Sequence, residues 1–410
     1  MKRVYTFYFT VIAAAAILLS ACSNDDGPDP NPVVEPESVT RAIIVYAVNN
    51  SSLSGDFTDD AVEMINSISA IADNHNQLIV YKTDADRQSA GLYLVQPCDR
   101  QLDADRAEDI ALVDNYFKLI KPYDLQKLTV ESDRMAEVIE EALGMYPNAT
   151  YDLILWGHGS AWQYSGNTSP AKVIHKSFGG EYDGTNRRKQ YWMNIDAMAD
   201  AIPDHRFNTI WFDSCLMSNI EVIYQLRDKC RTFVGYASEV YGGGMDYSRI
   251  LPQLFSRDRN LVGAAQSFFD SYNDFGFAVT VAVLQMNNIE RLAEVSAEIL
   301  RNRDILPNKT DLTDYSRPIL KMAVGFYDFK QYLSQIATLN NPTGAPELTR
   351  QLGLALSDLV LYHAASEKNF SGYAWDADNL SCVSTHLYDG SDNEQNRYYR
   401  TLDWFKRVYE

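Results

Sequence analysis

Short apolar runs alternate with amphipathic stretches along most of the chain after residue 40. Four runs are rich in β-branched and aromatic residues: 42–48 (AIIVYAV), 77–82 (QLIVYK), 151–156 (YDLILW) and 207–212 (FNTIWF). Runs of this length and composition are typical of strands buried on both faces of a parallel sheet. The stretch 57–72, between the first two runs, carries apolar residues at helical spacing. This alternation predicts an α/β fold with a mostly parallel sheet.

The alternation of apolar runs and amphipathic stretches continues beyond residue 212, and the later part of the chain becomes mainly helical. We predict further strands at 232–238 and 277–284, and helices at 193–202, 216–226, 248–255 and 261–272. From residue 289 the spacing becomes mainly helical, over 289–302, about 326–338 and 347–365, before a last strand at 380–387. We therefore predict one α/β domain over residues 41–288 and an accessory C-terminal region, 289–410, that packs on it.

The first 40 residues have a different composition. Residues 1–21 combine a basic start with an apolar core, which is typical of a secretory signal. The sequence from Leu19 to Cys22 resembles a bacterial lipobox, with cleavage before Cys22 and lipid on its thiol. An ordinary signal peptide with an incidental cysteine is the alternative. Residues 22–40 contain GPDPNPVVEPE and predict a stiff proline-rich tether.

The predicted lipid anchor gives the expected location. We expect the protein in the cell envelope, outside the cytoplasm and attached to the outer membrane through Cys22. The acidic stretch 23–26 (SNDD) resembles a surface-export tag, so we expect either outward display or orientation toward the periplasm.

The formal net charge of −19 restricts the partners. Such a surface does not suit nucleic acid or anionic lipid. It would attract basic peptides, although acidic residues on a secreted protein more often form only a solvated surface.

Cys215 closely follows the predicted strand 207–212 and precedes an apolar stretch of helical length. Open α/β sheets place their sites at the carboxyl ends of strands. A helix start there would lower the pKa of the thiol and make it a better nucleophile. The other cysteines after the tether are Cys98, Cys230 and Cys382, which we expect to be free buried thiols, with a disulfide at Cys98 as the alternative.

His158 follows another predicted strand in the same way, between Gly157 and Gly159. It precedes Cys215 by 57 residues, which leaves room for one crossover helix and a loop. If the two strands are neighbours, both side chains emerge at one edge of the sheet. We therefore predict that His158 serves Cys215 as its proton shuttle, with His175 as a weaker alternative base.

Two segments around these residues resemble a known family. YDLILWGHGSAW (151–162) and IWFDSC (210–215) are similar to the catalytic motifs of the clostripain family of cysteine peptidases. The resemblance implies a caspase-like fold and a Cys–His dyad that requires no cofactor. With the helical pattern after residue 289, we expect an αβα sandwich that carries a mainly helical C-terminal lobe. The resemblance also implies cleavage after basic residues. Calcium stimulates some members, and we see no EF-hand loop in this sequence.

Thiol peptide hydrolysis needs a nucleophile, a proton shuttle and an oxyanion site. We expect Cys215 to attack the scissile carbonyl and His158 to protonate the leaving amine. The main-chain N–H groups of Gly159 and Cys215 are the predicted oxyanion donors.

Asp213 is the predicted specificity residue. It lies two positions before Cys215, so both side chains point to the same face of the strand. Its carboxylate can pair with an Arg or Lys side chain of the substrate, and the resemblance supports this role. The alternative is that Asp213 only caps the helix that follows. The segment YASEVYGGGMDY (236–247) resembles the family's pocket wall, which suggests substrate-binding roles for Ser238, Glu239 and Asp246.

The stretch 162–188 is rich in Gly, Ser, Asn and Lys and is predicted to be a long loop. The resemblance implies maturation by an internal cut, for which the basic residues of this region are candidates: Lys172, Lys176, Arg187, Arg188 and Lys189. An uncut, solvated loop is the alternative.

These observations predict a cysteine endopeptidase that acts on proteins or peptides after Arg or Lys. Two other functions stay open on the sequence alone. One is a thiol transpeptidase or amidase on the same fold. The other is a surface lipoprotein that binds peptides without catalysis.

Overall fold

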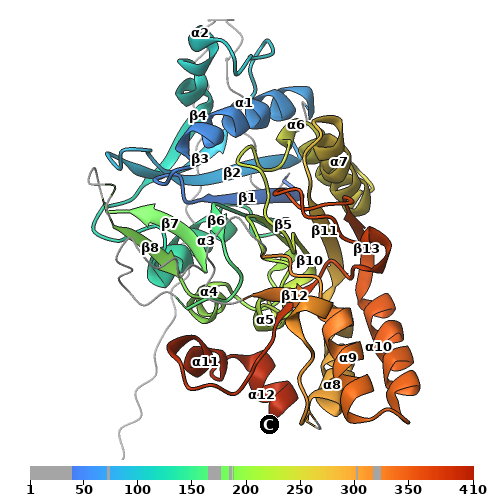
Figure 1. Ribbon diagram of the computed structural model, residues 1–410. Coiled ribbons are helices and arrows are strands. Elements are labelled where there is room, and N and C mark those ends of the chain that lie inside the picture. The colour runs from blue at the N-terminus through green and yellow to red at the C-terminus, as the bar shows by residue number, and fades with distance from the viewer. Residues whose placement is uncertain are drawn as a thin grey trace, which may run out of the picture. The chain divides into compact units, whose positions relative to one another are not determined.

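One mixed sheet forms the centre of the molecule (Figure 1). The computed structural model describes residues 39–71, 74–164, 177–183, 187, 189–301, 303–316 and 325–410. The strands of the central sheet are β1 (Arg41–Ala47), β2 (Asn76–Thr83), β3 (Ala90–Val95), β4 (Phe117–Pro122), β5 (Thr150–Trp156), β9 (Phe207–Asp213), β10 (Cys230–Gly235), β11 (Thr280–Gln285) and β13 (Val360–Ala365). Their order is β13-β11-β10-β9-β5-β1-β2-β3-β4.

The middle of this sheet is parallel. Strands β2, β1, β5, β9 and β10 run in one direction, whereas β3, β4, β11 and β13 pair antiparallel at the two sides. The residues of β1 after Arg41 are all buried, as expected for a strand covered on both faces. The predicted α/β fold with a mostly parallel sheet is therefore confirmed.

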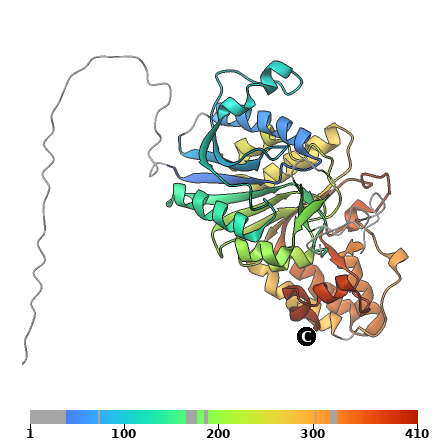
Figure 2. The same cartoon turned by 90° about the vertical axis from the view of Figure 1, so that its left-hand side faces the viewer.

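Helices cover both faces of the sheet, which makes an αβα sandwich (Figures 1 and 2). On one face lie α1 (Ser54–Ile71), α6 (Tyr247–Leu254) and α7 (Leu261–Asp274), whose apolar residues share a core with alternate residues of the strands. On the other face lie α3 (Ser132–Met145), α4 (Ile195–Ala201) and α5 (Ile220–Gln225). A short helix, α2 (Ala107–Ile110), precedes β4.

The C-terminal part is mainly helical but also completes the sheet. Its helices are α8 (Ile289–Leu300), α9 (Phe329–Asn340), α10 (Ala345–Leu359), α11 (Glu394–Tyr399) and α12 (Asp403–Tyr409). The prediction of one helix over 347–365 was wrong beyond residue 359, because Val360–Ala365 forms β13 and pairs with β11. The predicted domain boundary at residue 288 stays a prediction, although β13 belongs to the sheet of the preceding part.

Two further predictions near the candidate site need correction. The predicted loop 162–188 contains a strand, β7 (Phe178–Tyr182), which pairs with β6 (His158–Gly159) and β8 (Gln190–Met193). The helix predicted directly after Cys215 begins only at Ile220. Cys215 therefore does not lie at a helix start.

The described part of the chain contains no helix with the length and apolar character needed to cross a membrane.

Two small strands, β12 (Phe326–Asp328) and β14 (Ser384–His386), pair with each other in a sheet separate from the central one. Cys98, Cys230 and Cys382 are free and buried, as predicted.

Candidate active site

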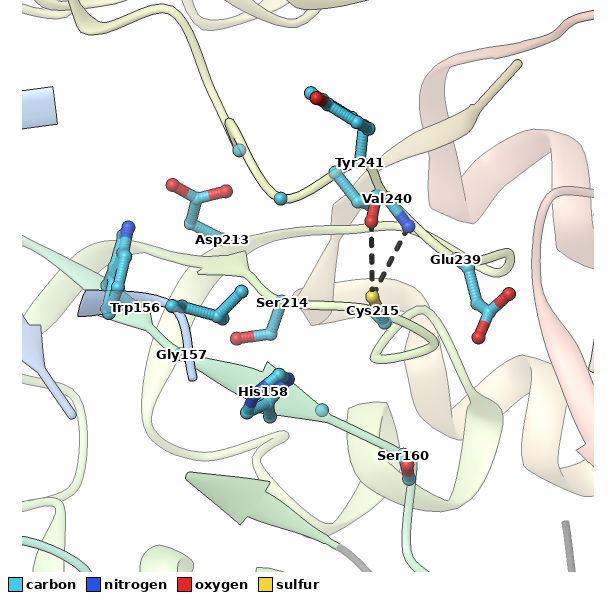
Figure 3. Close-up of a pocket in the computed structure, with 14 residues that line it drawn as sticks. Trp156, Gly157, His158, Ser160, Asp213, Ser214, Cys215, Glu239, Val240 and Tyr241 are labelled. Atoms are coloured by element: carbon cyan, nitrogen blue, oxygen red, sulfur yellow. Dashed lines mark hydrogen bonds between the residues drawn. The ribbon is translucent and has the colours of Figure 1, made fainter. Parts of the chain in front are cut away.

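The ends of two neighbouring strands bring His158 and Cys215 to one pocket. Strands β5 and β9 run parallel, with Trp156 opposite Asp213. His158 and Cys215 each lie two residues further on, at the carboxyl edge of the sheet. Both line a pocket of about 240 Å³ together with Asp213 (Figure 3). The sequence prediction of a shared site edge thus agrees with the structure.

Gly159 allows the two strand extensions to approach closely. A Cβ atom at this position would lie 2.4 Å from the carbonyl oxygen of Cys215, which is far below contact distance. Glycine is therefore required here by the packing of the two segments that carry the thiol and the imidazole.

The imidazole of His158 has a hydroxyl partner from outside the sheet. Nε2 lies 2.8 Å from Oγ of Ser52, in the segment between β1 and α1. The ring also lies 5.9 Å, centroid to centroid, from the indole of Trp192 on β8. Among the described residues that line the pocket, His158 is the only one that can carry a positive charge.

The sulfur of Cys215 is held against the main chain of Val240. The N–H of Val240 lies 3.3 Å from Sγ and donates to it, and the thiol lies 3.6 Å from the Val240 carbonyl oxygen (Figure 3). Burial raises the pKa of the Cys215 thiol to about 12, and the nearby Glu239 carboxylate adds to this rise. Since no helix begins at Cys215, the expected lowering of its pKa by a helix terminus is absent. The thiol therefore needs a base to become a nucleophile.

Asp213 is a buried carboxyl group in the same pocket. Oδ1 accepts a hydrogen bond from the N–H of Met245 at 3.1 Å, and Oδ2 accepts one from the hydroxyl of Tyr247 at 3.2 Å. Neither of these partners is a Lys, Arg or His side chain, and burial raises the pKa of Asp213 to about 7. It caps no helix, because the nearest helix after it starts at Ile220.

Comparison with known protein families gives a match over most of the chain. The model of the Clostripain family matches residues 45–402.

The chain belongs to the clostripain family.

It is accordingly a cysteine-type peptidase. A comparison with curated proteins gave no match. One similar solved structure is a secreted C11 cysteine protease from Bacteroides thetaiotaomicron in complex with an irreversible peptide inhibitor. Its sequence is 23% identical to this chain and its TM-score is 0.71. The match covers 90% of this chain and 98% of that chain. An inactive zymogen C11 protease from Parabacteroides distasonis is 22% identical with a TM-score of 0.71, over 93% of this chain and all of that one. At these identities the likeness establishes the fold, which is the caspase-like one expected.

This clostripain-family chain has two acidic groups behind its pocket that the sequence analysis missed. Asp60 on α1 accepts a hydrogen bond from Nε1 of Trp156 at 2.6 Å, and Glu63 accepts one from the N–H of Tyr247 at 2.8 Å. Burial and then the Asp213 carboxylate raise the pKa of Asp60 well above its usual range. Burial, followed by the charge of Asp246, raises the pKa of Glu63 to about 8.

A signal for one of them was present in the sequence. The buried residues of α1 include Phe57, Ala61 and Met64, and Asp60 lies among them. An acidic residue on the apolar face of an amphipathic helix is costly unless it has a partner, so it indicates a polar site nearby.

The remaining predicted pocket residues differ in where they lie. Glu239 lines the pocket, as Gly159 does. Ser238 is buried elsewhere, with Oγ 3.1 Å from the hydroxyl of Thr280. Asp246 caps α6 by accepting from the N–H of Arg249, and also pairs with the Arg249 guanidinium at 3.0 Å. Neither Ser238 nor Asp246 is among the residues that line the pocket.

Several predicted residues lie outside the described residues: Cys22, Lys172, His175, Lys176 and Arg188. Arg187 and Lys189 are described, and Arg187 is exposed beside the ring of Tyr182. The described residues contain no group of three or more His, Cys, Asp or Glu side chains that could hold a metal ion, so calcium binding stays a prediction from the resemblance.

Proposed function

We propose that the chain is an endopeptidase that cleaves after Arg or Lys with Cys215 as nucleophile and His158 as acid and base. One observation carries the proposal. A thiol, an imidazole and a buried carboxyl group line a single pocket at the ends of two adjacent parallel strands. These are the groups needed to attack an amide, protonate its leaving group and recognise a cationic side chain.

The proposed reaction has two steps. The Cys215 sulfur bonds to the scissile carbonyl carbon while its proton passes to His158, which then protonates the departing amine as the C–N bond breaks. The resulting thioester is attacked by water, His158 takes a proton from that water, and the carboxylic acid leaves as the thiol is restored. The N–H groups of Gly159 and Cys215 are proposed to donate to the oxyanion in both steps.

The basic specificity rests on Asp213. Its carboxyl group is buried in the same pocket as the thiol, and its hydrogen-bond partners among the described residues, Met245 and Tyr247, carry no positive charge. A Lys or Arg side chain of a substrate would supply the missing counter-charge and stabilise the ionised form of Asp213.

Hydrolysis of short reporter peptides tests the proposal. Peptides with Arg, Lys, Asp or Ala before the scissile bond are compared with wild type and with Cys215→Ala. We expect turnover of the first two by wild type alone, and free acid rather than an amine adduct when an amine acceptor is added. Equal cleavage of all four peptides would contradict the proposed specificity, and an adduct as the main product would favour transpeptidation.

We further propose that the protein cuts itself within the region 172–189. Arg187 is exposed, which allows a second molecule to reach it. On a denaturing gel, wild type is expected to give two fragments and Cys215→Ala a single chain. A variant with Gln at Arg187, Arg188 and Lys189 shows whether this run is the site. Two fragments from Cys215→Ala would remove self-cleavage.

We also propose that lipid on Cys22 anchors the protein outside the cytoplasm. The lipobox-like sequence before Cys22 supports this, and the relative from Bacteroides thetaiotaomicron is described as secreted. After cell fractionation, wild type is expected in the membrane fraction and Cys22→Ser in the soluble one. Membrane association of Cys22→Ser equal to that of wild type would contradict the anchor.

A further inference from the structure

A group of aromatic side chains is partly exposed to solvent next to the candidate active site. The ring of Tyr241 stacks on that of Phe277, with centroids 4.3 Å apart and planes at 13°, and lies 6.1 Å from the ring of Phe370. Phe275 lies 6.5 Å from Phe277. The exposed fractions are 46% for Tyr241, 69% for Phe275 and 43% for Phe370. We call these four residues the aromatic platform.

The platform is built from three separate segments, and hydrogen bonds hold them in place. The hydroxyl of Tyr272 donates to the carbonyl oxygens of Tyr241 and Gly244, at 3.3 and 2.8 Å, which fixes the Tyr241 loop. The segment with Phe370 is held to the start of β11, where the N–H of Ser366 donates to the carbonyl of Val279 at 3.0 Å. Fixed aromatic rings left in solvent by three segments mark a binding surface more often than isolated exposed rings do.

The platform continues directly from the pocket. Tyr241 lines the pocket itself, and it follows Val240, whose main chain contacts the Cys215 sulfur. Figure 3 shows this sulfur between His158 on one side and Val240 with Tyr241 on the other. Whatever occupies the platform therefore also lies beside the thiol.

The position of His158 decides which half of a peptide lies there. A residue that protonates the leaving amine must be near the amine half of the scissile bond. The acyl half then lies on the opposite side of the sulfur, toward Val240 and Tyr241. An extended peptide advances about 3.3 Å per residue, so the platform is within reach of the second to fourth residues before the cut.

We propose that the aromatic platform binds an apolar side chain of the substrate, two to four residues before the basic residue at the cut. This inference rests on the proposed function, because it takes the orientation of the substrate from the role of His158. The preferred substrate thus combines a cationic side chain for Asp213 with a leucine-like or phenylalanine-like side chain upstream. The aromatic rings supply contact area and a face for stacking.

Paired reporter peptides test the platform. Each peptide ends in Lys before the reporter and carries either Leu, Phe or Gly at one of the three preceding positions. We expect wild type to prefer Leu or Phe over Gly at one position by about tenfold in kcat/KM, as aromatic contacts of this kind typically give. Phe370→Ala should reduce that preference at least threefold, measured as the ratio of kcat/KM for the Leu or Phe peptide to kcat/KM for the all-glycine peptide.

Two variants control for unrelated effects. Leu354→Ala removes a side chain on α10 that is also 43% exposed but does not line the pocket, and it should leave the preference unchanged. Phe370→Tyr keeps the ring and should keep the preference. Cleavage of the glycine peptide without any upstream preference would overturn the platform and leave the peptidase proposal intact.

A binding measurement covers the case in which no peptide is cleaved. Cys215→Ala is titrated with the same labelled peptides, and fluorescence anisotropy reports affinity without turnover. Tighter binding of the Leu or Phe peptide than of the glycine peptide, lost in Cys215→Ala with Phe370→Ala, supports the platform independently of catalysis. Equal affinities for all peptides would overturn it.

Discussion

Replacing His158 with alanine is expected to lower kcat/KM for a lysyl or arginyl peptide by about 10⁴-fold or more, and Cys215→Ala by at least as much. The double variant should be no slower than Cys215→Ala alone, since two groups that act as one unit lose their effect together. The physical reason lies in the thiol. Burial raises its pKa to about 12, so it is protonated at neutral pH and requires a base to accept its proton.

Ser52→Ala is the matched control for this comparison of the His158 and Cys215 single variants with the double variant. Its hydroxyl lies 2.8 Å from Nε2 of His158 but contributes no chemistry, so we expect a loss of no more than about tenfold, typical of one hydrogen bond. Alkylation of Cys215 by iodoacetamide gives a readout besides turnover and should slow in His158→Ala. If the losses of the two single variants simply multiply in the double variant, the two residues do not act as a dyad.

The central sheet was predictable because it is buried on both faces. Such strands leave continuous apolar runs in the sequence, as 42–48 and 151–156 do, and β1 and β5 lie within a residue of these bounds. The placement of His158 and Cys215 followed from their position after two such runs. Alternation of strands and helices makes neighbouring parallel strands the expected arrangement, and the pairing of β5 with β9 agrees with it.

The segment after Cys215 shows what the local pattern missed. Its apolar residues have helical spacing, yet Leu216 has a φ of 63°, which is outside the range of a right-handed helix, and the helix begins only at Ile220. The main chain there bonds to distant segments instead, since the N–H of Leu216 donates to Ser238 and that of Ser218 to Tyr236. Long-range hydrogen bonds of this kind leave no periodic signal in a sequence.

The acidic groups behind the pocket were missed for a related reason. Asp60 and Glu63 belong to α1, about 150 residues before Asp213, and only the fold brings them close. Strand β13 is similar, because its place beside β11 depends on an antiparallel pairing between segments 80 residues apart. Residue type and spacing placed His158 and Cys215 at one edge of the sheet, whereas the acidic groups around that pocket required the tertiary structure.

Asp213→Asn is expected to lower kcat/KM for lysyl and arginyl peptides by about 10²- to 10³-fold, the loss typical when one partner of a buried charge pair is removed. The amide keeps the shape of the carboxyl group, so the effect on folding should be small. Asp246→Asn is the matched control, because that residue caps α6 and does not line the pocket. Loss of activity in Asp246→Asn equal to that in Asp213→Asn would contradict the special role of Asp213.

The pH dependence of substrate discrimination, compared between wild type and Asp213→Asn, is the stronger test. Burial raises the pKa of Asp213 to about 7 in the free enzyme, with Asp60 and Glu63 facing it from α1 and the tyrosine hydroxyl of Tyr247 bonded to it. Below that pH the carboxyl group is neutral and cannot pair with a basic side chain. Above it the carboxylate is charged, so discrimination in favour of a cation should rise with pH and level off.

The ratio of kcat/KM for an arginyl peptide to that for its uncharged citrulline analogue isolates this titration, because ionisation of Cys215 and His158 affects both substrates alike. We expect the wild-type ratio to fall as the pH drops through about 7, since kcat/KM reports ionisation in the free enzyme. In Asp213→Asn the ratio should be low and flat across this range. Asp60→Asn should retain the transition, because burial of Asp213 itself is the main cause of its raised pKa. A wild-type ratio that does not change with pH would show that Asp213 is not the group that recognises the cation.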